Sequence, residues 1–185
     1  MFLLNHQLIK NYIDTNSSVL NIWQYRLSNL QHTFYYFRLG SEGQINGNPF
    51  KLGDDADNKF LTIEPNDFAV IKSHETFALS DKILAIFGQS SDLIKKGGQL
   101  LHSPFIDPQF KGKLELGIKN VGTKPIVLEY KNQIIGKISF FDISDTYPIV
   151  INPHSKIAKK YKDRGPEIDD EAIHSNQQDD EDDDE

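Results

Sequence analysis

Residues 105–112 read FIDPQFKG and combine an apolar pair, an aspartate, a turn proline and a glycine. They lead directly into residues 113–118, KLELGI, which we expect to form a β-strand. An aspartate held between a turn and a strand is a common way to aim a carboxylate at a bound water. Asp107 is therefore the first candidate catalytic residue. Aspartate before proline also accepts backbone N–H bonds in turns, so a structural role for Asp107 stays open.

Strand-like segments separated by turn residues extend in both directions from this run. We expect strands at residues 33–39, 60–65, 68–72, 83–87, 112–119, 126–130 and 134–143. Residues 41–58 are rich in Gly, Asn and Asp and predict a long polar loop or hairpin. Asn5 is positioned to cap a short helix, and residues 91–97 to form a helical turn. The spacing predicts a mainly β fold, a distorted antiparallel β barrel or jelly roll with a short N-terminal helix.

The composition excludes several classes of site. The chain has 185 residues and no cysteine, which excludes disulfides, thiolate metal sites and a cysteine nucleophile. The glycine-rich phosphate loops GxxxxGK[ST] and GxGxxG are absent from the sequence. The six histidines show no metal-ligand spacing. Because no apolar run approaches ~20 residues and the N-terminus offers no signal sequence, we expect a cytoplasmic protein without a membrane association.

The charge is divided unevenly along the chain. Residues 167–185 hold 11 of the 27 acidic residues and none of the basic ones. Residues 1–166 therefore carry 20 basic against 16 acidic residues, a formal charge of +4. We expect a single domain over residues 1–166, whose mildly basic character suits a small anionic ligand rather than nucleic acid. We expect residues 167–185 to be an acidic disordered tail, either merely solvating or able to bind a basic partner.

Five separated segments, in order, resemble the dCTP deaminase and dUTPase family. Residues 31–40 are similar to the family's QPASYDLRLG, residues 63–68 to IEPGEF, and residues 87–91 to a segment containing GRSS. Residues 106–112 are similar to IDPGFxG, and residues 160–166 to the C-terminal KYQGQxGP. Any one match is weak, but five collinear matches make an unrelated carbohydrate- or protein-binding β domain a poor alternative.

The resemblance implies a dUTPase-like β barrel that assembles as a homotrimer and binds dCTP or dUTP between subunits. Asp107 matches the aspartate that positions the attacking water in dUTPases and lies against the deoxyribose in deaminases. Gln89, Ser90 and Ser91 match the phosphate loop, while Glu115 and Leu116 fall on the substrate-binding strand. Lys160, Tyr161 and Arg164 match a segment that closes over the nucleotide. Any Mg²⁺ would be carried by the triphosphate.

Four positions depart from the family pattern. Gln89 replaces the phosphate-loop arginine and cannot give a bidentate charge-assisted bond. Gly117 replaces the deaminase glutamate that shuttles protons, and Glu115 on the same strand face is a possible substitute. Tyr36 replaces the aspartate of YDLRLG, and Lys137 replaces the glutamine of the family's IGQ, where it is a triphosphate contact or an exposed lysine. The sequence therefore supports two hypotheses, a dCTP/dUTP nucleotidohydrolase and a catalytically degenerate relative with a nucleotide-binding, regulatory or interaction role.

Overall fold

The computed structural model describes residues 1–144, which are mainly β-strands. The predicted lid residues Lys160, Tyr161 and Arg164 and the acidic tail lie outside the described residues. The strands are β1 (Phe2–Leu3), β2 (Leu20–Trp23), β3 (Leu30–Gln31), β4 (Phe34–Ile45), β5 (Asn48–Lys51), β6 (Phe60–Ile63), β7 (Phe68–Leu79), β8 (Ile83–Gln89), β9 (Gly98–Leu101), β10 (Phe105–Ile106), β11 (Lys111–Asn120), β12 (Ile126–Glu129) and β13 (Ile134–Asp142). The helices are α1 (His6–Asp14), α2 (Ser91–Lys95) and two short 3₁₀ turns, Leu27–Asn29 and Ala56–Asn58.

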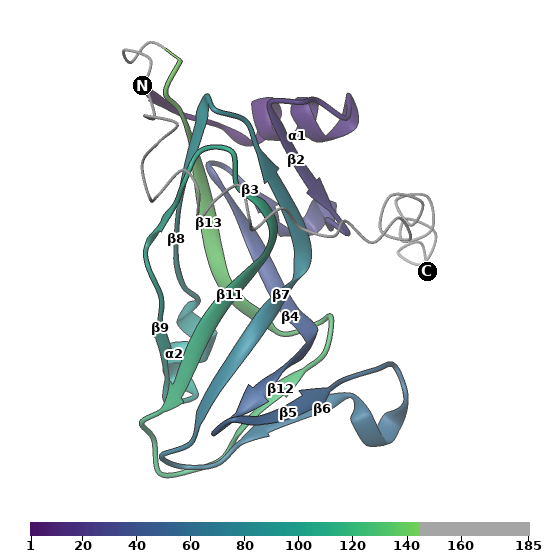
Figure 1. Ribbon diagram of the computed structural model, residues 1–185, viewed down its shortest axis with the longest axis vertical. Coiled ribbons are helices and arrows are strands. Elements are labelled where there is room, and N and C mark those ends of the chain that lie inside the picture. The colour runs from purple at the N-terminus through teal and green to yellow at the C-terminus, as the bar shows by residue number, and fades with distance from the viewer. Residues whose placement is uncertain (145–185) are drawn as a thin grey trace, which may run out of the picture.

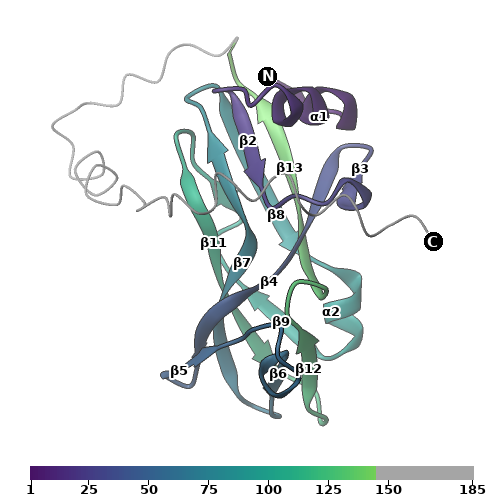
Figure 2. The same cartoon turned by 90° about the vertical axis from the view of Figure 1, so that its right-hand side faces the viewer.

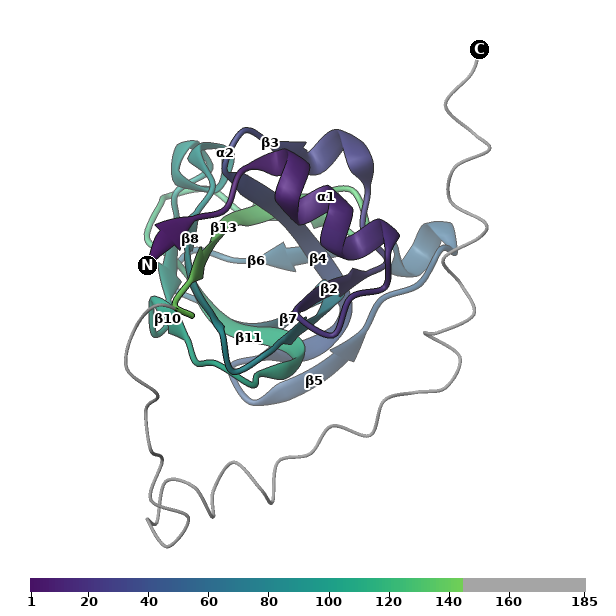
Figure 3. The same ribbon diagram turned by 90° about the horizontal axis from the view of Figure 1, so that it is seen from above.

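One curled antiparallel sheet contains most of the strands. Its order is β10-β8-β13-β4-β7-β11-β9, with β1, β2, β3 and β5 paired to individual strands of this path. β6 and β12 form a separate two-stranded sheet. The long strands run the length of the molecule (Figure 1). Seen from above, they are arranged in a ring, and α1 lies across its edge (Figure 3). β5, β6 and β12 lie at the end opposite α1 (Figure 2). This architecture confirms the predicted distorted antiparallel barrel.

The core consists of the side chains at every second position along the strands. In β7 every second residue is buried, and in β8 Ile83, Ala85 and Phe87 point inward. Phe37, Phe77 and Phe140 are among the largest fully buried side chains. Because inward and outward side chains alternate with a period of two, the register that buries these residues also fixes which residues face outward.

The predicted N-terminal helix is confirmed as α1. Asn5 caps it, its Oδ1 accepting a hydrogen bond of 3.0 Å from the Leu8 N–H, and Ile9 and Ile13 are the buried residues. The polar stretch 41–58 forms a hairpin, because β4 continues to Ile45 and turns at Asn46-Gly47 into β5. β7 extends seven residues beyond the predicted strand at 68–72, ending at Leu79.

Candidate functional site

Asp107 opens a tight turn between β10 and β11. The Phe110 N–H donates to the Asp107 carbonyl at 3.2 Å, and Gln109 occupies the third position with φ of 68°. Proline in second place and a positive φ in third place define a type II turn. The Gln109 N–H also donates to the Ser80 carbonyl at 3.0 Å, which ties the turn to the β7–β8 connection. The turn is therefore anchored on both sides, and the Asp107 residue is exposed.

The predicted phosphate-loop residues lie where β8 passes into α2. Ser90 caps α2: its Oγ accepts from the Leu93 N–H at 3.2 Å and donates to the Ile134 carbonyl at 3.2 Å. The residue is only 4% exposed. The Gln89 amide is bonded to the β9 backbone, donating to the Gly98 carbonyl and accepting from the Leu100 N–H at 3.0 Å. Ser91 is exposed. The side chains of Ser90 and Gln89 thus hold this chain's own fold together.

A single chain does not bring Asp107 and the phosphate-loop residues together. Ile106 pairs with Ala85, so Asp107 lies beside the part of β8 that leads to the β7–β8 turn. Ser90 lies five strand steps beyond Ala85, a distance of about 17 Å at ~3.3 Å per residue. In Figure 1 the β7–β8 turn is near the end that carries α1, whereas α2 lies in the other half of the molecule. A ligand that contacts both groups at short range would need a second chain.

The residues of β11 divide between its two faces. Glu115 is exposed on the outer face, whereas the Leu116 side chain is 2% exposed in the core. The backbone of β11 is paired with β7 and, from Gly117 onward, also with β9. In the strand order β11 is separated from β8 by β13, β4 and β7. The curled sheet nevertheless brings the end of β8 against β9, the neighbour of β11, through the hydrogen bonds of Gln89.

Gly117 has no space for a side chain in this packing. A Cβ atom at Gly117 would lie 2.6 Å from Cε2 and 2.7 Å from Cζ of Phe68, and 3.4 Å from the Leu101 Cβ. The Phe68 ring thus occupies the volume into which a glutamate at this position would extend. A glutamate here would require that ring to move.

Three of the four departures lie on neighbouring strands. Tyr36 of β4 is the direct cross-strand partner of Lys137 of β13, which in turn faces Gly88 of β8. Gly136 is the partner of Gln89. The Lys137 Nζ lies 5.2 Å from the centre of the Phe34 ring, which meets Tyr36 edge-on at 5.1 Å. Tyr36 and Lys137 therefore share the outer face, whereas Gln89, opposite Gly136, is on a neighbouring strand with its side chain on the other face.

The outer face of β4, β13, β8 and β10 is otherwise largely apolar. Residues directly opposite in antiparallel strands share a face, and Phe105 is opposite Ile86, Leu84 opposite Phe141, and Leu3 of β1 opposite Phe141. Phe105 is 55% exposed and Leu3 41%. By contrast, the outward positions of β7 and β11 include four lysines and a glutamate: Lys72, Lys113, Glu115, Lys119 and Lys111. The first surface, called here the apolar outer face, is suited to burial against a protein.

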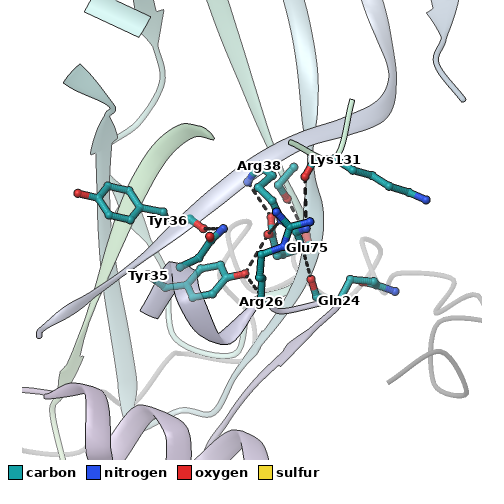
Figure 4. A network of polar contacts seen from close by, with 9 residues as sticks. Gln24, Arg26, Tyr35, Tyr36, Arg38, Glu75 and Lys131 are labelled. Carbon is teal, nitrogen blue, oxygen red and sulfur yellow. Dashed lines mark hydrogen bonds and ion pairs between the residues drawn. The ribbon is translucent and has the colours of Figure 1, made fainter. Parts of the chain in front are cut away.

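A buried polar network that the sequence did not suggest lies between β4 and β7 (Figure 4). The Glu75 carboxylate accepts from Arg38 Nε at 2.7 Å, from the Arg38 N–H at 2.9 Å and from the Tyr35 hydroxyl at 3.0 Å. The Arg38 guanidinium also donates to the backbone carbonyls of Gln24 and Lys131. Arg38 is 2% exposed and Glu75 0%. Burial raises the pKa of Glu75, and Arg38 opposes that effect.

His74 lies beside this network and is held neutral. Burial lowers its pKa to about 3, and the nearby charges of Arg38 and Lys131 act in the same direction. Its ring meets Tyr130 edge-on at 5.8 Å. Among residues 1–144, no group of three His, Cys, Asp or Glu side chains could hold a metal ion. No helix in the same part of the chain is long and apolar enough to cross a membrane.

Comparison with known proteins identifies the family. Residues 3–143 match the family model described as dCTP deaminase-like, so the chain belongs to the dCTP deaminase-like family. The chain is 39% identical over 93 residues to a dUMP-forming dCTP deaminase of Beutenbergia cavernae, covering 49% of this chain and 46% of that protein. It is 36% identical over 97 residues to the corresponding protein of Tropheryma whipplei, covering 51% and 48%. The chain thus spans about half the length of these curated relatives.

The fold has a solved counterpart. The crystal structure of 2′-deoxycytidine 5′-triphosphate deaminase from Agrobacterium tumefaciens superimposes with a TM-score of 0.62 at 15% identity. The match covers 75% of this chain and 47% of that chain. It supports the dUTPase-like barrel predicted from the sequence.

Proposed function

We propose that the protein is a pyrimidine deoxynucleoside triphosphate nucleotidohydrolase that releases diphosphate from dUTP, and does not deaminate dCTP. The observation that carries the proposal is the contrast between two positions. Asp107 is exposed in an anchored turn, where its carboxylate can act on a water. Gly117 has no side chain and is covered by Phe68, so the proton transfer needed at a cytosine amine has no donor there.

The site is proposed to form between subunits of a homotrimer. Asp107 lies one residue beyond the Ile106–Ala85 pair, and Ala85 is about 17 Å from Ser90 along β8, so one copy would supply the turn and another the phosphate loop. The apolar outer face, which includes Phe105 beside the Asp107 turn, gives the copies a surface to bury. Such an assembly obeys the usual preference of homo-oligomers for closed symmetry.

Mg²⁺ is proposed to reach the site on the triphosphate. Magnesium commonly binds through substrate phosphates and one or two carboxylates rather than a protein cage. Asp107 is an exposed carboxylate that could take a water of such an ion. Its role in the proposed reaction is to orient and deprotonate the water that attacks a phosphorus atom.

A turnover assay tests the proposal. The protein is incubated with Mg²⁺ and either dUTP or dCTP, and the products are separated by ion exchange. We expect dUMP and diphosphate from dUTP, with a loss of about 100-fold or more in Asp107→Asn. Asp57→Asn, another exposed aspartate in the loop between β5 and β6, should leave the rate unchanged. A uridine nucleotide formed from dCTP would show that another residue performs the role lost at Gly117.

A second candidate function is a nucleotide-binding relative without catalysis. The Gln89 amide and the Ser90 hydroxyl form hydrogen bonds within the chain's own fold. This observation favours the second function, because these two side chains are not free to bind a phosphate. Nucleotide binding by equilibrium dialysis without turnover in the same preparation would select this function. Turnover that is lost with Asp107→Asn would exclude it.

A further inference from the structure

We propose that Gln133 is a positioning residue for the phosphate loop, because its amide holds α2 in the direction that lets the exposed Ser91 meet a phosphate. The inference rests on the proposed function, since it concerns the same site. Gln133 lies in the connection between β12 and β13, and Ser91 is the first residue of α2. Gln133 acts through α2 and does not itself contact the ligand.

The helix α2 depends on the rest of the fold for its direction. It has only five residues, too few to form a stable helix alone. Leu93 is its buried residue, and Ser90 fixes its start through the Ile134 and Ile135 carbonyls. Neither contact restrains the C-terminal end of α2.

The Gln133 amide restrains both ends of α2 at once. Its Nε2 donates to Asp92 Oδ2 at 2.7 Å, and its Oε1 accepts from Lys96 Nζ at 2.5 Å. Asp92 and Lys96 are four residues apart, so they lie on one side of the helix, where they pair at 3.2 Å. The amide nitrogen also donates to the Ile134 carbonyl at 3.0 Å. Gln133 therefore links an ion pair that spans α2 to the start of β13.

This link requires a side chain that both donates and accepts hydrogen bonds. Glutamate at position 133 would accept from Lys96 but would repel Asp92, and methionine would bond to neither. The hydrogen bond from Gln133 is the main reason that the pKa of Asp92 is lowered, and the hydrogen bond and charge of Lys96 act in the same direction. The amide thus keeps the carboxylate ionised and paired.

Gln133 is itself held firmly by the barrel. Its N–H donates to the Glu129 carbonyl at 2.9 Å, and its carbonyl accepts from the Leu39 N–H at 3.0 Å. The buried Arg38 donates to the carbonyl of Lys131 in the same connection at 3.3 Å. The position of Gln133 is therefore set by the long strand β4, and the amide passes that fixed position on to α2.

Phosphate binding and turnover test the assignment. Calorimetric affinity for inorganic tripolyphosphate with Mg²⁺, and KM and kcat for dUTP, are measured for the native protein and Gln133→Met. This substitution removes the link without changing the net charge. We expect tripolyphosphate binding to weaken and KM to rise, each by about tenfold, because the phosphate loop is displaced. The kcat should fall less, since the Asp107 turn is untouched.

Asn5→Ala is the matched control. The Asn5 amide also holds a helix, accepting from the Leu8 N–H at 3.0 Å, but that helix is α1, in the other half of the molecule from α2 (Figure 2). Both substitutions should lower the melting temperature. Asn5→Ala should change KM and tripolyphosphate affinity by about twofold at most. A role of Gln133 in stability alone would make the two variants equal in these measurements.

A double variant restores the link in reverse. Gln133→Glu combined with Asp92→Asn places the carboxylate on the β13 side and the amide on α2, where it can donate, and leaves the net charge as in the native protein. We expect it to recover most of the lost affinity. Gln133→Glu alone should not recover it, since two carboxylates would then face each other.

The outcomes separate this assignment from the proposed function. Equal KM and affinity in Gln133→Met and Asn5→Ala, or a folded double variant that recovers nothing, would overturn the assignment and leave the nucleotidohydrolase intact. Tripolyphosphate binding that depends on Gln133, without dUTP turnover in the native protein, would support the assignment and reject the hydrolase. Neither binding nor turnover in the native protein would overturn both.

Discussion

The backbone conformation of Gln109 lowers the stability of the folded protein. It has a φ of 68° in the third position of the turn that presents Asp107. The left-handed region costs an ordinary L-residue about 1–2 kcal/mol, and glycine occupies it without that penalty. The family pattern IDPGFxG has glycine at this position. The resemblance therefore already indicated that Gln109 replaces a glycine in a turn where φ is positive.

Replacing Gln109 by glycine should stabilise the protein. We expect Gln109→Gly to raise the free energy of unfolding by about 0.5–1 kcal/mol, because relief of strain exceeds the added entropy of the unfolded chain. Urea denaturation measures the change. Gln99→Gly is the matched control: Gln99 is an exposed residue within β9, where glycine should instead destabilise by a similar amount. Equal effects of the two substitutions would contradict the argument.

The residues of the candidate site were predictable from the sequence to differing extents. Asp107 was found through its turn, and the structure places it in one. The internal hydrogen bonds of Ser90 and Gln89 were not predictable, since they depend on the distant strands β13 and β9. Nor was the contact of Phe68 with Gly117, two residues that the register of β7 and β11 brings together.

At the scale of elements, β7 shows why the hydrophobic pattern predicted only part of a strand. Its alternation of buried residues includes Ser73 and Glu75, which a hydrophobic pattern does not count as core. The pairing with β11 shifts between Lys113 and Glu115, and there the Ser73 hydroxyl accepts from the Leu114 N–H at 2.8 Å. The polar residues are buried because hydrogen bonds satisfy them, a condition that a local window of sequence cannot reveal.

The buried ion pair between β4 and β7 leads to a prediction about coupling. Arg38→Met should lower the free energy of unfolding by about 3–5 kcal/mol, because the buried Glu75 carboxylate is left without its counter-charge. Arg38→Met combined with Glu75→Met should cost less than the single change. Lys72→Met, which breaks the exposed pair with Glu42, is the control and should cost about 1 kcal/mol or less. Chemical denaturation of the four proteins, native included, measures the differences, and a double variant that is less stable than Arg38→Met would refute the coupling.

At the scale of the whole molecule, the apolar outer face predicts self-association. We expect light scattering to show an oligomer for the native protein, and Phe105→Asp to shift it to monomer by burying a charge in the contact. Phe60→Asp is matched in exposure, 52% against 55%, but lies on β6 in the separate two-stranded sheet. It should leave the assembly unchanged. Monomeric native protein at high concentration would reject the proposed trimer.

The Asp107 turn and the phosphate loop lie too far apart on one chain to meet, so assembly of the chains would control the activity by mass action. Turnover would depend on the assembled fraction, so the rate per chain would fall on dilution and rise again when substrate draws copies together. An inactive copy could be rescued by another with a different lesion, since an intact turn and an intact phosphate loop would meet across one contact. Mixing Asp107→Asn chains with chains whose phosphate loop has been inactivated would then restore part of an activity that neither has alone.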